Sequence, residues 1–418
     1  MSSIFEGFLA TPEALELFSE RKFVQAMLRF EAALARAQAS VGLIPESAAQ
    51  SIAGTCQVEL FDVAKIVRES GRAGSIAIPL VKSLKETVSL FNQEAAGFVH
   101  FGCSSQDVID SAMALVTRDV LAMIEMDVHK AVAALLVLAE RHAATPVLAR
   151  TLMQPASVIS FGLKCAGWVA PLIRSLQRLQ AVSANALSLQ LGGAVETLAH
   201  MSKNGQNLGP QVSALMALDL KLKDPPFAWH TQRDEWVALA CELALLVGSL
   251  GKIAKDISLS GQFEVGEVAE PLEAGNGGAS SMRHQFANGQ PLACMVALAA
   301  AQRAPQRVAA LLAAMPQEHE RALGNWQAEL AEWPGLLMSA HGSARAMAQA
   351  LPHLQVDAER MRANLETVRA GLPRELADER FNPAQAQHAA TLTHTQVALQ
   401  ANALAALRKP APSLASTK

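Results

Sequence analysis

The chain has 418 residues, of which 51% are hydrophobic and 17% charged, and its formal net charge at pH 7 is −3. This length is sufficient for two or three domains with a large buried core. The small negative charge excludes the basic surface that binds nucleic acids or anionic membranes, so we expect neither as a partner.

The N-terminal region is predicted to be helical. Thr11 followed by Pro12 and Glu13 is typical of a helix start, with an N-cap, a proline at the first position and an acid in the first turn. A longer helix follows, because apolar residues recur at intervals of three and four from residue 23 to residue 37. Gly42 and Pro45 are expected to end it.

A helical pattern of unusual length begins near residue 107. Ser104 and Asp107 fit the S-x-x-[DE] signature of a helix start, and the pattern continues to residue 142. At 1.5 Å per residue, this helix is roughly 50 Å long. Similar stretches are predicted at 157–187, 232–268 and 291–323. Their apolar residues face all directions, which favours an all-α fold whose long helices are buried in a large oligomeric bundle.

The chain is predicted to divide into three parts. These are an N-terminal helical domain over 1–105, a central long-helix domain over 106–340 and a short C-terminal helical domain over 341–418. Beyond Trp333-Pro334 the chain is more polar, and shorter helices are expected there. The tail at 409–418 is expected to be disordered.

The cysteines indicate a reducing environment. They are widely spaced and form no C-x-x-C pair, which argues against a zinc site or a disulfide framework: Cys56, Cys103, Cys165, Cys241 and Cys294. The first residues lack the pattern of a secretion signal, and no apolar stretch approaches the ~18 residues that span a bilayer. We therefore expect a soluble cytoplasmic protein.

The segment HFGCSSQDVID (100–110) places polar side chains just before the longest helix. His100, Ser104, Ser105 and Gln106 lie where backbone N–H groups attract anions, so the segment could bind a carboxylate or phosphate. The alternative is that Ser104 only caps the helix.

Two further segments have the same character. In RTLMQPASVISFG (150–162), Thr151 and Gln154 could bind a polar substrate or could satisfy the backbone around Pro155. In FAWHTQRDEW (227–236), His230 and Arg233 could form a proton-transfer group or a structural ion-pair cluster.

Three acids recur in QFEVGEVAEP (262–271). Glu264, Glu267 and Glu270 have three-residue spacing, which predicts that they share one side of a helix. Such a face is usually solvated. In a buried bundle the acids would need partners, and could orient a histidine or lysine.

The glycine-rich segment EAGNGGASSMRHQFANGQP (273–291) carries Ser280 and Ser281, with Arg283 and His284 close behind. Glycines allow a loop to move over a site. A serine acts as a base only where nearby positive charge favours its ionised form, and Arg283 and His284 could supply that charge. The alternative is an ordinary linker between helices.

Taken together, these segments resemble the fumarase/aspartase superfamily. The resemblance runs in colinear order over roughly residues 15–300, from LFSERKFVQAMLRFEAALARAQASVGLIP through IPLVK, HFGCSSQDVIDS, ARTLMQPASVISFGLK, LGGA, WHTQRDE and QFEVGEVAEP to the glycine-rich loop. WHTQRD and EVGEV are most similar to the bacterial 3-carboxy-cis,cis-muconate cycloisomerases.

This resemblance implies an all-α homotetramer with a core of about twenty long helices and active sites that three subunits share. It also implies addition or elimination across a carbon–carbon bond next to a carboxylate, without metal or organic cofactor. Hydroxyl, amide and cationic donors hold the charge that develops on the substrate.

The resemblance also implies roles for individual residues. The catalytic residues would be Ser280, assisted by His230 and His100. The substrate-binding residues would be Ser104, Ser105, Gln106, Thr151, Gln154, Arg233, Ser281, Met282, Arg283 and His284.

The chain departs from the family pattern at several positions. Leu152 stands where fumarase-like members have a catalytic histidine, a loss that fits the cycloisomerase branch. In the loop, Gln285 replaces a lysine and Ala287 an asparagine, and Arg283 stands at a proline position. Glu196 occupies a glycine position of the GGAxGT pattern.

The function that the resemblance implies is that of a lactonising 3-carboxy-cis,cis-muconate cycloisomerase in protocatechuate (β-ketoadipate) breakdown, acting on a polycarboxylate. Two alternatives stay open. One is a diverged lyase or cycloisomerase for another unsaturated acid, such as a sulfonated muconate. The other is a catalytically impaired homologue, which the altered loop motivates.

Overall fold

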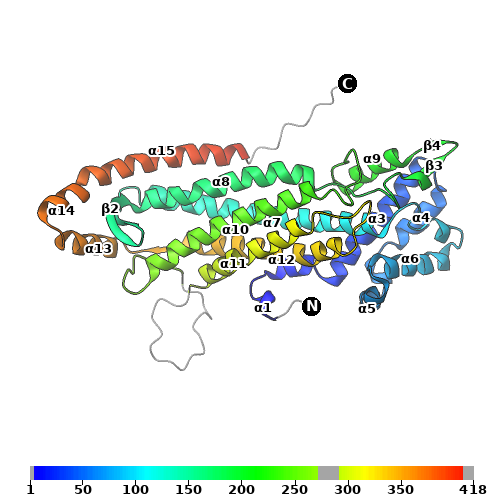
Figure 1. Cartoon of the computed structure of the whole chain (residues 1–418), viewed down its shortest axis with the longest axis horizontal. Coiled ribbons are helices and arrows are strands. Elements are labelled where there is room, and N and C mark those ends of the chain that lie inside the picture. Colours follow the sequence, from blue (N-terminus) through cyan, green and yellow to red (C-terminus); the bar gives the residue numbers. More distant parts are fainter. Residues whose placement is uncertain (1–3, 272–290, 408–418) are drawn as a thin grey trace, which may run out of the picture. The chain divides into compact units, whose positions relative to one another are not determined.

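The computed structural model describes residues 4–271 and 291–407 (Figure 1). Helices make up most of these residues, which confirms the predicted all-α fold class. The chain forms two compact units, each assembled from three separate segments. Unit 1 contains residues 1–122, 180–241 and 306–338, and unit 2 contains residues 123–179, 242–305 and 339–418. The three-domain division by sequence position stays a prediction.

Unit 1 begins with short helices around the long helix α3 (Glu20–Ser40), whose apolar face packs on α4 and α9 (Figure 1). Thr11 caps α2 as predicted, because its hydroxyl accepts a hydrogen bond from the N–H of Ala14 at 3.2 Å. The other elements of this unit are α1 (Ile4–Gly7), α2 (Pro12–Leu17), α4 (Glu46–Thr55), η1 (Val58–Leu60), α5 (Val63–Ala73), α6 (Ala77–Phe91), η2 (Ala95–Phe98), η3 (Ala199–Met201), β3 (Ser202–Lys203), β4 (Gln206–Asn207) and α9 (Gly209–Leu220).

Each of the long helices has its first residues in one unit and its last residues in the other. They are α7 (Ser105–Arg141), α8 (Phe161–Ala186), α10 (Asp234–Gly261), α11 (Leu292–Ala313) and α12 (Asn325–Ala350). The predicted helix start at Ser104 is confirmed by reciprocal capping bonds. The Ser104 N–H donates to Asp107 Oδ2 at 2.8 Å, and the Asp107 N–H donates to Ser104 Oγ at 3.4 Å.

The helix predicted over 232–268 is shorter than expected, because α10 ends at Gly261. Gly266 then adopts a φ of +61°, a left-handed conformation that no α-helix contains. The expectation that Glu264, Glu267 and Glu270 share a helix face is therefore wrong. Glu267 is buried and pairs with Arg150 at 3.0 Å, rather than with a histidine or lysine.

Glu270 has a different local role. Its carboxylate accepts hydrogen bonds from the N–H groups of Ala293 and Cys294, both at 2.9 Å. These two donors belong to the first turn of α11, where N–H groups lack partners within the helix. Glu270 therefore caps α11.

The expectation of shorter helices beyond Trp333-Pro334 is confirmed for α13 (Ala358–Ala370) and α14 (Arg374–Arg380) but is wrong for α12 and α15. Helix α12 continues through Pro334 to Ala350, and α15 (Pro383–Leu407) has 25 residues. Trp333 is completely buried and stacks on Trp236 with ring centroids 4.0 Å apart. This packing keeps the segment helical although proline removes one hydrogen-bond donor.

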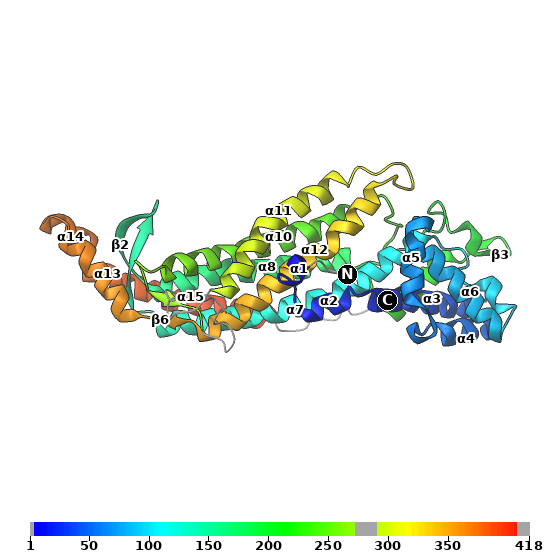
Figure 2. The same ribbon diagram turned by 90° about the horizontal axis from the view of Figure 1, so that it is seen from below.

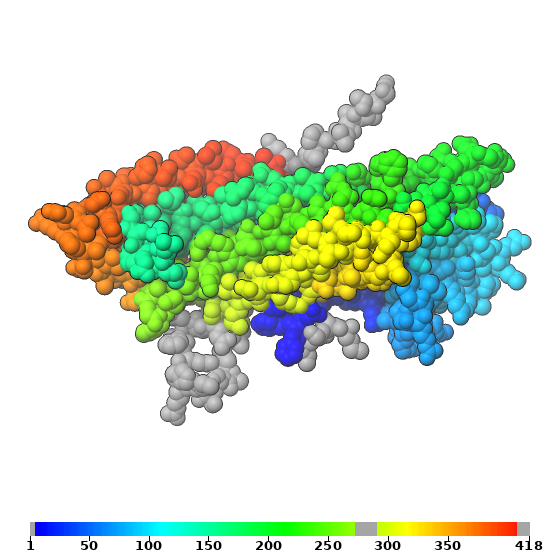
Figure 3. Space-filling view, in the orientation of Figure 1, coloured from blue at the N-terminus to red at the C-terminus, as the bar shows by residue number. Residues whose placement is uncertain are grey.

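Unit 2 carries an antiparallel hairpin of β1 (Pro146–Thr151) and β2 (Gln154–Ser160), which packs against α13, α14 and α15 (Figures 2 and 3). The hairpin contributes Leu148 and Val158 to a buried hydrophobic cluster that also contains Leu365 and Phe381. The remaining elements are β5 (Val268–Ala269), η4 (Leu351–His353), β6 (Gln355–Val356), α13 (Ala358–Ala370) and α14 (Arg374–Arg380). Strand β5 pairs with β6.

The expectation that no apolar stretch approaches the length of a membrane span is wrong for α10, the one helix among the described residues that is long and apolar enough to cross a membrane. Its most apolar window is 56% buried within the structure. Buried core helices of soluble proteins meet the same criteria of length and composition.

Candidate active site

Asp107, in the first turn of α7, is the residue around which the polar groups of unit 1 gather. Its carboxylate is completely buried and accepts four hydrogen bonds. The backbone N–H groups of Ser104 and Gly193 donate to Oδ2 at 2.8 and 3.0 Å. The N–H of Gly192 and Nε2 of His230 contact Oδ1 at 2.9 and 2.6 Å. These four donors replace the water that burial removes from the carboxylate.

His230 is held in place by this carboxylate. Because a carboxylate without a proton only accepts hydrogen bonds, Nε2 of His230 carries the hydrogen of the 2.6 Å contact. The ring packs directly on Gly192, where an added Cβ would lie 2.4 Å from the histidine Cε1. Its other nitrogen, Nδ1, lies 3.4 Å from Oε1 of Glu196. His230 is completely buried, and its predicted catalytic role stays a prediction.

Arg233 lies in an ion-pair cluster with Asp110 on α7 and Glu329 on α12. All five N–H bonds of its guanidinium have acceptors on these two carboxylates or on the Trp229 carbonyl. Burial alone would lower the pKa of Arg233, but the two carboxylates raise it above its ordinary value. The predicted substrate contact stays a prediction, and these contacts favour a positioning role.

The three polar residues at the start of α7 face different directions. Gln106 is buried, and its amide donates to Asp110 Oδ2 at 3.2 Å and to the His230 carbonyl at 2.9 Å. Ser104 and Ser105 are half-buried. The serines are therefore better placed than Gln106 to meet a ligand.

Arg321, between α11 and α12, brings a positive charge to Ser104. Its Nη2 donates to Ser104 Oγ at 3.1 Å and also to the Gly193 carbonyl. Burial lowers its pKa below the ordinary value, which the carboxylates of Asp107, Glu196 and Asp110 oppose. The Arg321 guanidinium nevertheless stays charged at neutral pH, because arginine is not deprotonated in proteins. A hydroxyl beside a guanidinium is a suitable pair of donors for a carboxylate.

His100 lies on a tight backbone turn with a φ of +62°. Its Nδ1 contacts Oε1 of the buried Glu31 at 2.7 Å. Burial lowers the pKa of His100, but the charge and hydrogen bond of Glu31 raise it, and the net result lies above the ordinary value. The structure places His100 in unit 1 with Ser104, and its assisting role stays a prediction.

Thr151 and Gln154 lie in unit 2, opposite each other at the tip of the β1–β2 hairpin. Leu152 and Met153 form the two-residue turn, and both have a positive φ. The side chains of this turn are strongly exposed, at 96% for Leu152 and 72% for Met153.

The predicted loop residues lie outside the described part of the chain. They are the catalytic candidate Ser280 and the substrate-binding candidates Ser281, Met282, Arg283 and His284. Their roles stay predictions that rest on the sequence.

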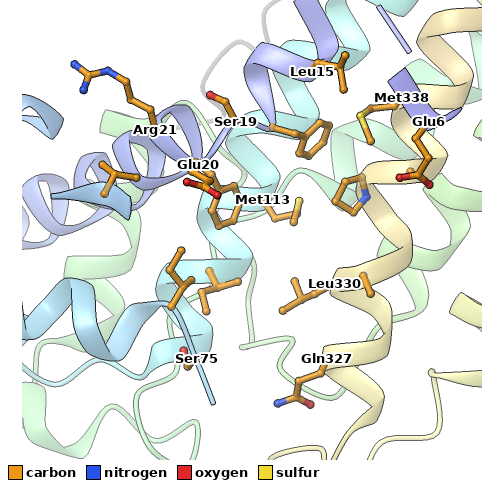
Figure 4. A pocket seen from close by; sticks show the side chains of 18 of the residues that line it. Glu6, Leu15, Ser19, Glu20, Arg21, Ser75, Met113, Gln327, Leu330 and Met338 are labelled. Carbon is orange, nitrogen blue, oxygen red and sulfur yellow. The ribbon is translucent and has the colours of Figure 1, made fainter. Parts of the chain in front are cut away.

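A separate pocket of about 970 Å³ lies in unit 1 (Figure 4). Apolar side chains such as Leu15, Met113, Leu330 and Met338 surround it, with Glu20 and Arg21 at one side. None of the predicted site residues that the structure describes lines this pocket. The pocket and the polar cluster around Asp107 are therefore different features.

The sequence-based site prediction missed Asp107, Arg321 and Glu196. In the sequence, Asp107 is recognisable only as a helix-start residue. Its place in a polar segment is the one further sign that its carboxylate accepts hydrogen bonds. Arg321 stands in the polar segment QEHERALGN between two helical patterns. Glu196 was visible as a departure from the GGAxGT pattern. Nothing local predicts that these residues meet.

Within residues 4–271 and 291–407, no group of three or more histidine, cysteine, aspartate or glutamate side chains could hold a metal ion. The expectation that no metal or cofactor takes part stays a prediction.

Comparison with known proteins places these features in a family context. A family model described as Lyase matches residues 8–286. A 3-carboxy-cis,cis-muconate cycloisomerase of Pseudomonas aeruginosa is 43% identical over 364 residues, which cover 87% of this chain and 78% of the relative. A nitrosuccinate lyase of Streptomyces davaonensis is 35% identical over 404 residues, which cover 95% and 84%.

A solved structure has the same fold. The crystal structure of the 3-carboxy-cis,cis-muconate lactonizing enzyme from Pseudomonas putida superimposes with a TM-score of 0.85 at 34% sequence identity. The match covers 98% of this chain and all of that one. The long helices and the polar segments between them therefore belong to a shared architecture.

Proposed function

This chain belongs to the lyase family of the fumarase/aspartase superfamily and is one of its enzymes, and from this membership we propose that it is a 3-carboxy-cis,cis-muconate cycloisomerase. The observation that carries the proposal is the 43% identity to a cycloisomerase over 87% of the chain. In the proposed reaction, one substrate carboxylate adds to a carbon–carbon double bond and closes a lactone. The reaction would serve protocatechuate breakdown through the β-ketoadipate pathway in the cytoplasm.

The cluster around Asp107 supports binding of a polycarboxylate. Ser104 Oγ and the Arg321 guanidinium lie 3.1 Å apart and both offer donors. Asp107 holds the backbone that carries Ser104, and it also binds the two glycine N–H groups next to the Gly193 carbonyl. The donors are thereby positioned before a substrate arrives, which lowers the cost of ordering them.

The remaining roles follow the family pattern. Ser280 would transfer the proton, with His230 and His100 assisting. Ser105, Ser281, Met282, Arg283 and His284 would contact the substrate. Thr151 and Gln154 would do so from the hairpin of another subunit, because active sites in the proposed homotetramer are shared. Arg233 and Gln106 would position the segment around His230.

The direct test is an absorbance assay with purified protein. Lactonisation removes the conjugated diene of 3-carboxy-cis,cis-muconate, so its ultraviolet absorbance should fall with time in proportion to enzyme concentration. Heat-inactivated protein is the control. Unchanged absorbance with this substrate and with related muconates, at high enzyme concentration, would contradict the proposal.

A second candidate is a lyase or cycloisomerase for another unsaturated acid, such as a sulfonated muconate. It is favoured by Glu196, which stands at a glycine position of the family pattern and brings a negative charge close to Arg321. The nitrosuccinate lyase, which covers more of the chain than the cycloisomerase does, shows that enzymes with other substrates are also similar to it. A catalytically impaired homologue would be inactive on all these acids.

The proposed tetramer predicts an effect of the exposed hairpin turn. Leu152→Asp is expected to weaken assembly, because a side chain that is 96% exposed in the single chain would be buried between subunits. Light scattering should give about four times the 44.3 kDa chain mass for the unmodified protein and less for the variant.

The control for this prediction is Leu90→Asp, at a leucine that is 80% exposed near the end of α6. It should leave the mass unchanged. A monomeric unmodified protein would contradict the shared-site tetramer, and an unaffected Leu152→Asp variant would place the hairpin outside the interface.

A further inference from the structure

Glu196 has a backbone conformation that side chains rarely adopt. Its φ is +65°, in the left-handed region where the Cβ of any residue except glycine meets the backbone. Strain of this kind persists only where surrounding contacts hold it, and it occurs often at functional sites. The contacts of the Glu196 side chain therefore indicate what holds this strained conformation.

The side chain of Glu196 faces His230. Its Oε1 lies 3.4 Å from the histidine Nδ1, a buried nitrogen that makes no hydrogen bond to any residue in the described ranges 4–271 and 291–407. The side chain of Glu196 is 31% exposed, whereas the side chain of His230 is completely buried. The carboxylate is thus the member of this pair that water or a ligand can reach.

Asp107 determines which nitrogen of His230 faces Glu196. Because Asp107 accepts the hydrogen on Nε2, the remaining nitrogen Nδ1 is left to bind or release a proton. Asp107 itself has three backbone donors besides the histidine, from Ser104, Gly192 and Gly193. It is therefore suited to orient the ring rather than to take up its proton.

The other charged groups near this pair are already engaged. Arg321 lies close enough to Asp107 and Glu196 for their charges to interact. Asp110 and Arg233 pair with each other at 2.9 Å. Asp107 and Asp110 are buried, so Glu196 is the acid with a solvent-exposed side chain among these described neighbours of His230.

We propose that Glu196 and His230 share the proton that this site delivers to its substrate. This inference rests on the proposed function. In the lactonisation, a carboxylate lone pair forms the new C–O bond, and the electron pair of the C=C bond takes up one proton at the neighbouring carbon. The Glu196–His230 pair holds that proton one step before the proton-transfer group of the proposed function and regains it from water through the exposed carboxylate, so that each turnover consumes one proton from solvent.

Three substitutions at Glu196 test this proposal. Glu196→Gln keeps the shape and removes the charge, so kcat should fall about 100-fold with little change in KM. Glu196→Asp keeps a carboxylate and should retain more activity than Glu196→Gln. Glu196→Gly fits the left-handed backbone, so Tm should rise while kcat falls. If Glu196 had only a structural role, Glu196→Gly would not raise Tm and lower kcat at the same time.

NMR of ¹⁵N-labelled full-length protein gives a readout that does not require activity. Loss of the carboxylate beside Nδ1 in Glu196→Gln should change the ¹⁵N chemical shift of His230 Nδ1 relative to the unmodified protein.

The outcomes separate this inference from the proposed function. Unchanged kcat and an unchanged Nδ1 chemical shift of His230 in Glu196→Gln would overturn the role of Glu196, even if the unmodified enzyme consumes 3-carboxymuconate. Inactivity of the unmodified enzyme on muconates, with a changed Nδ1 chemical shift in Glu196→Gln, would overturn the proposed substrate and support the Glu196–His230 pair.

Discussion

Arg233→Met is expected to lower the free energy of unfolding by about 3–5 kcal/mol, or to prevent folding altogether. Arg233 is 2% exposed and lies between the buried carboxylates of Asp110 and Glu329. Without the guanidinium, two negative charges would face each other in a region closed to water. The side chain also stacks over the Trp229 ring at 4.4 Å, a contact that methionine reproduces only in part.

The measurement is urea unfolding followed by circular dichroism. Arg374→Met is the matched control, because the Arg374 side chain is 95% exposed and its distance to Asp378 is 3.8 Å. An exposed pair of this kind contributes little, and the control should change stability by less than about 0.5 kcal/mol. Equal stabilities of the two variants would show that the Arg233 cluster contributes no more than a surface pair.

Ser280→Ala is expected to lower kcat by about 100- to 10,000-fold, which is the usual contribution of a proton-transfer group. The expectation rests on the position of Ser280 within the glycine-rich segment, where it aligns with the catalytic serine of the superfamily. The substitution removes one hydroxyl and leaves the glycines of the segment unchanged. Steady-state kinetics on 3-carboxymuconate measure the effect.

Ser281→Ala is the control, because the neighbouring serine is proposed to contact the substrate without transferring the proton. It should cost less than about 10-fold in kcat. Full activity of Ser280→Ala would reject the role of that serine. A large loss in Ser281→Ala alone would transfer the role to Ser281.

Local features of the fold were predictable because they depend on neighbours in the sequence. The capping box of Ser104 and Asp107 joins residues three positions apart, so the helix start could be read directly. The same is true of Thr11 and of the apolar face of α3. The end of α10 was missed, because Gly266 lies between acids whose spacing suits a helix.

The polar residues of the site were recognisable by type, while their partners were not. Arg233 was identified as a functional or ion-paired residue, but its acceptors lie 123 and 96 positions away, on α7 and α12. The substrate contact predicted for Gln106 stays a prediction, and its amide donates to the carbonyl of His230, 124 positions away. Whether such a side chain binds substrate or pairs within the chain depends on which elements pack together. A local sequence pattern does not contain that information.

The sequence by itself determined the all-α class, the superfamily and the segments that carry polar chemistry, because helix periodicity and motif order are properties of neighbouring residues. Only the tertiary structure decided that Asp107 gathers Ser104, the two glycines and His230, and that Arg321 and Glu196 join them. The physical reason is that burial removes water from charged groups. Each then needs a partner, and the packing of distant helices determines which partner is within reach.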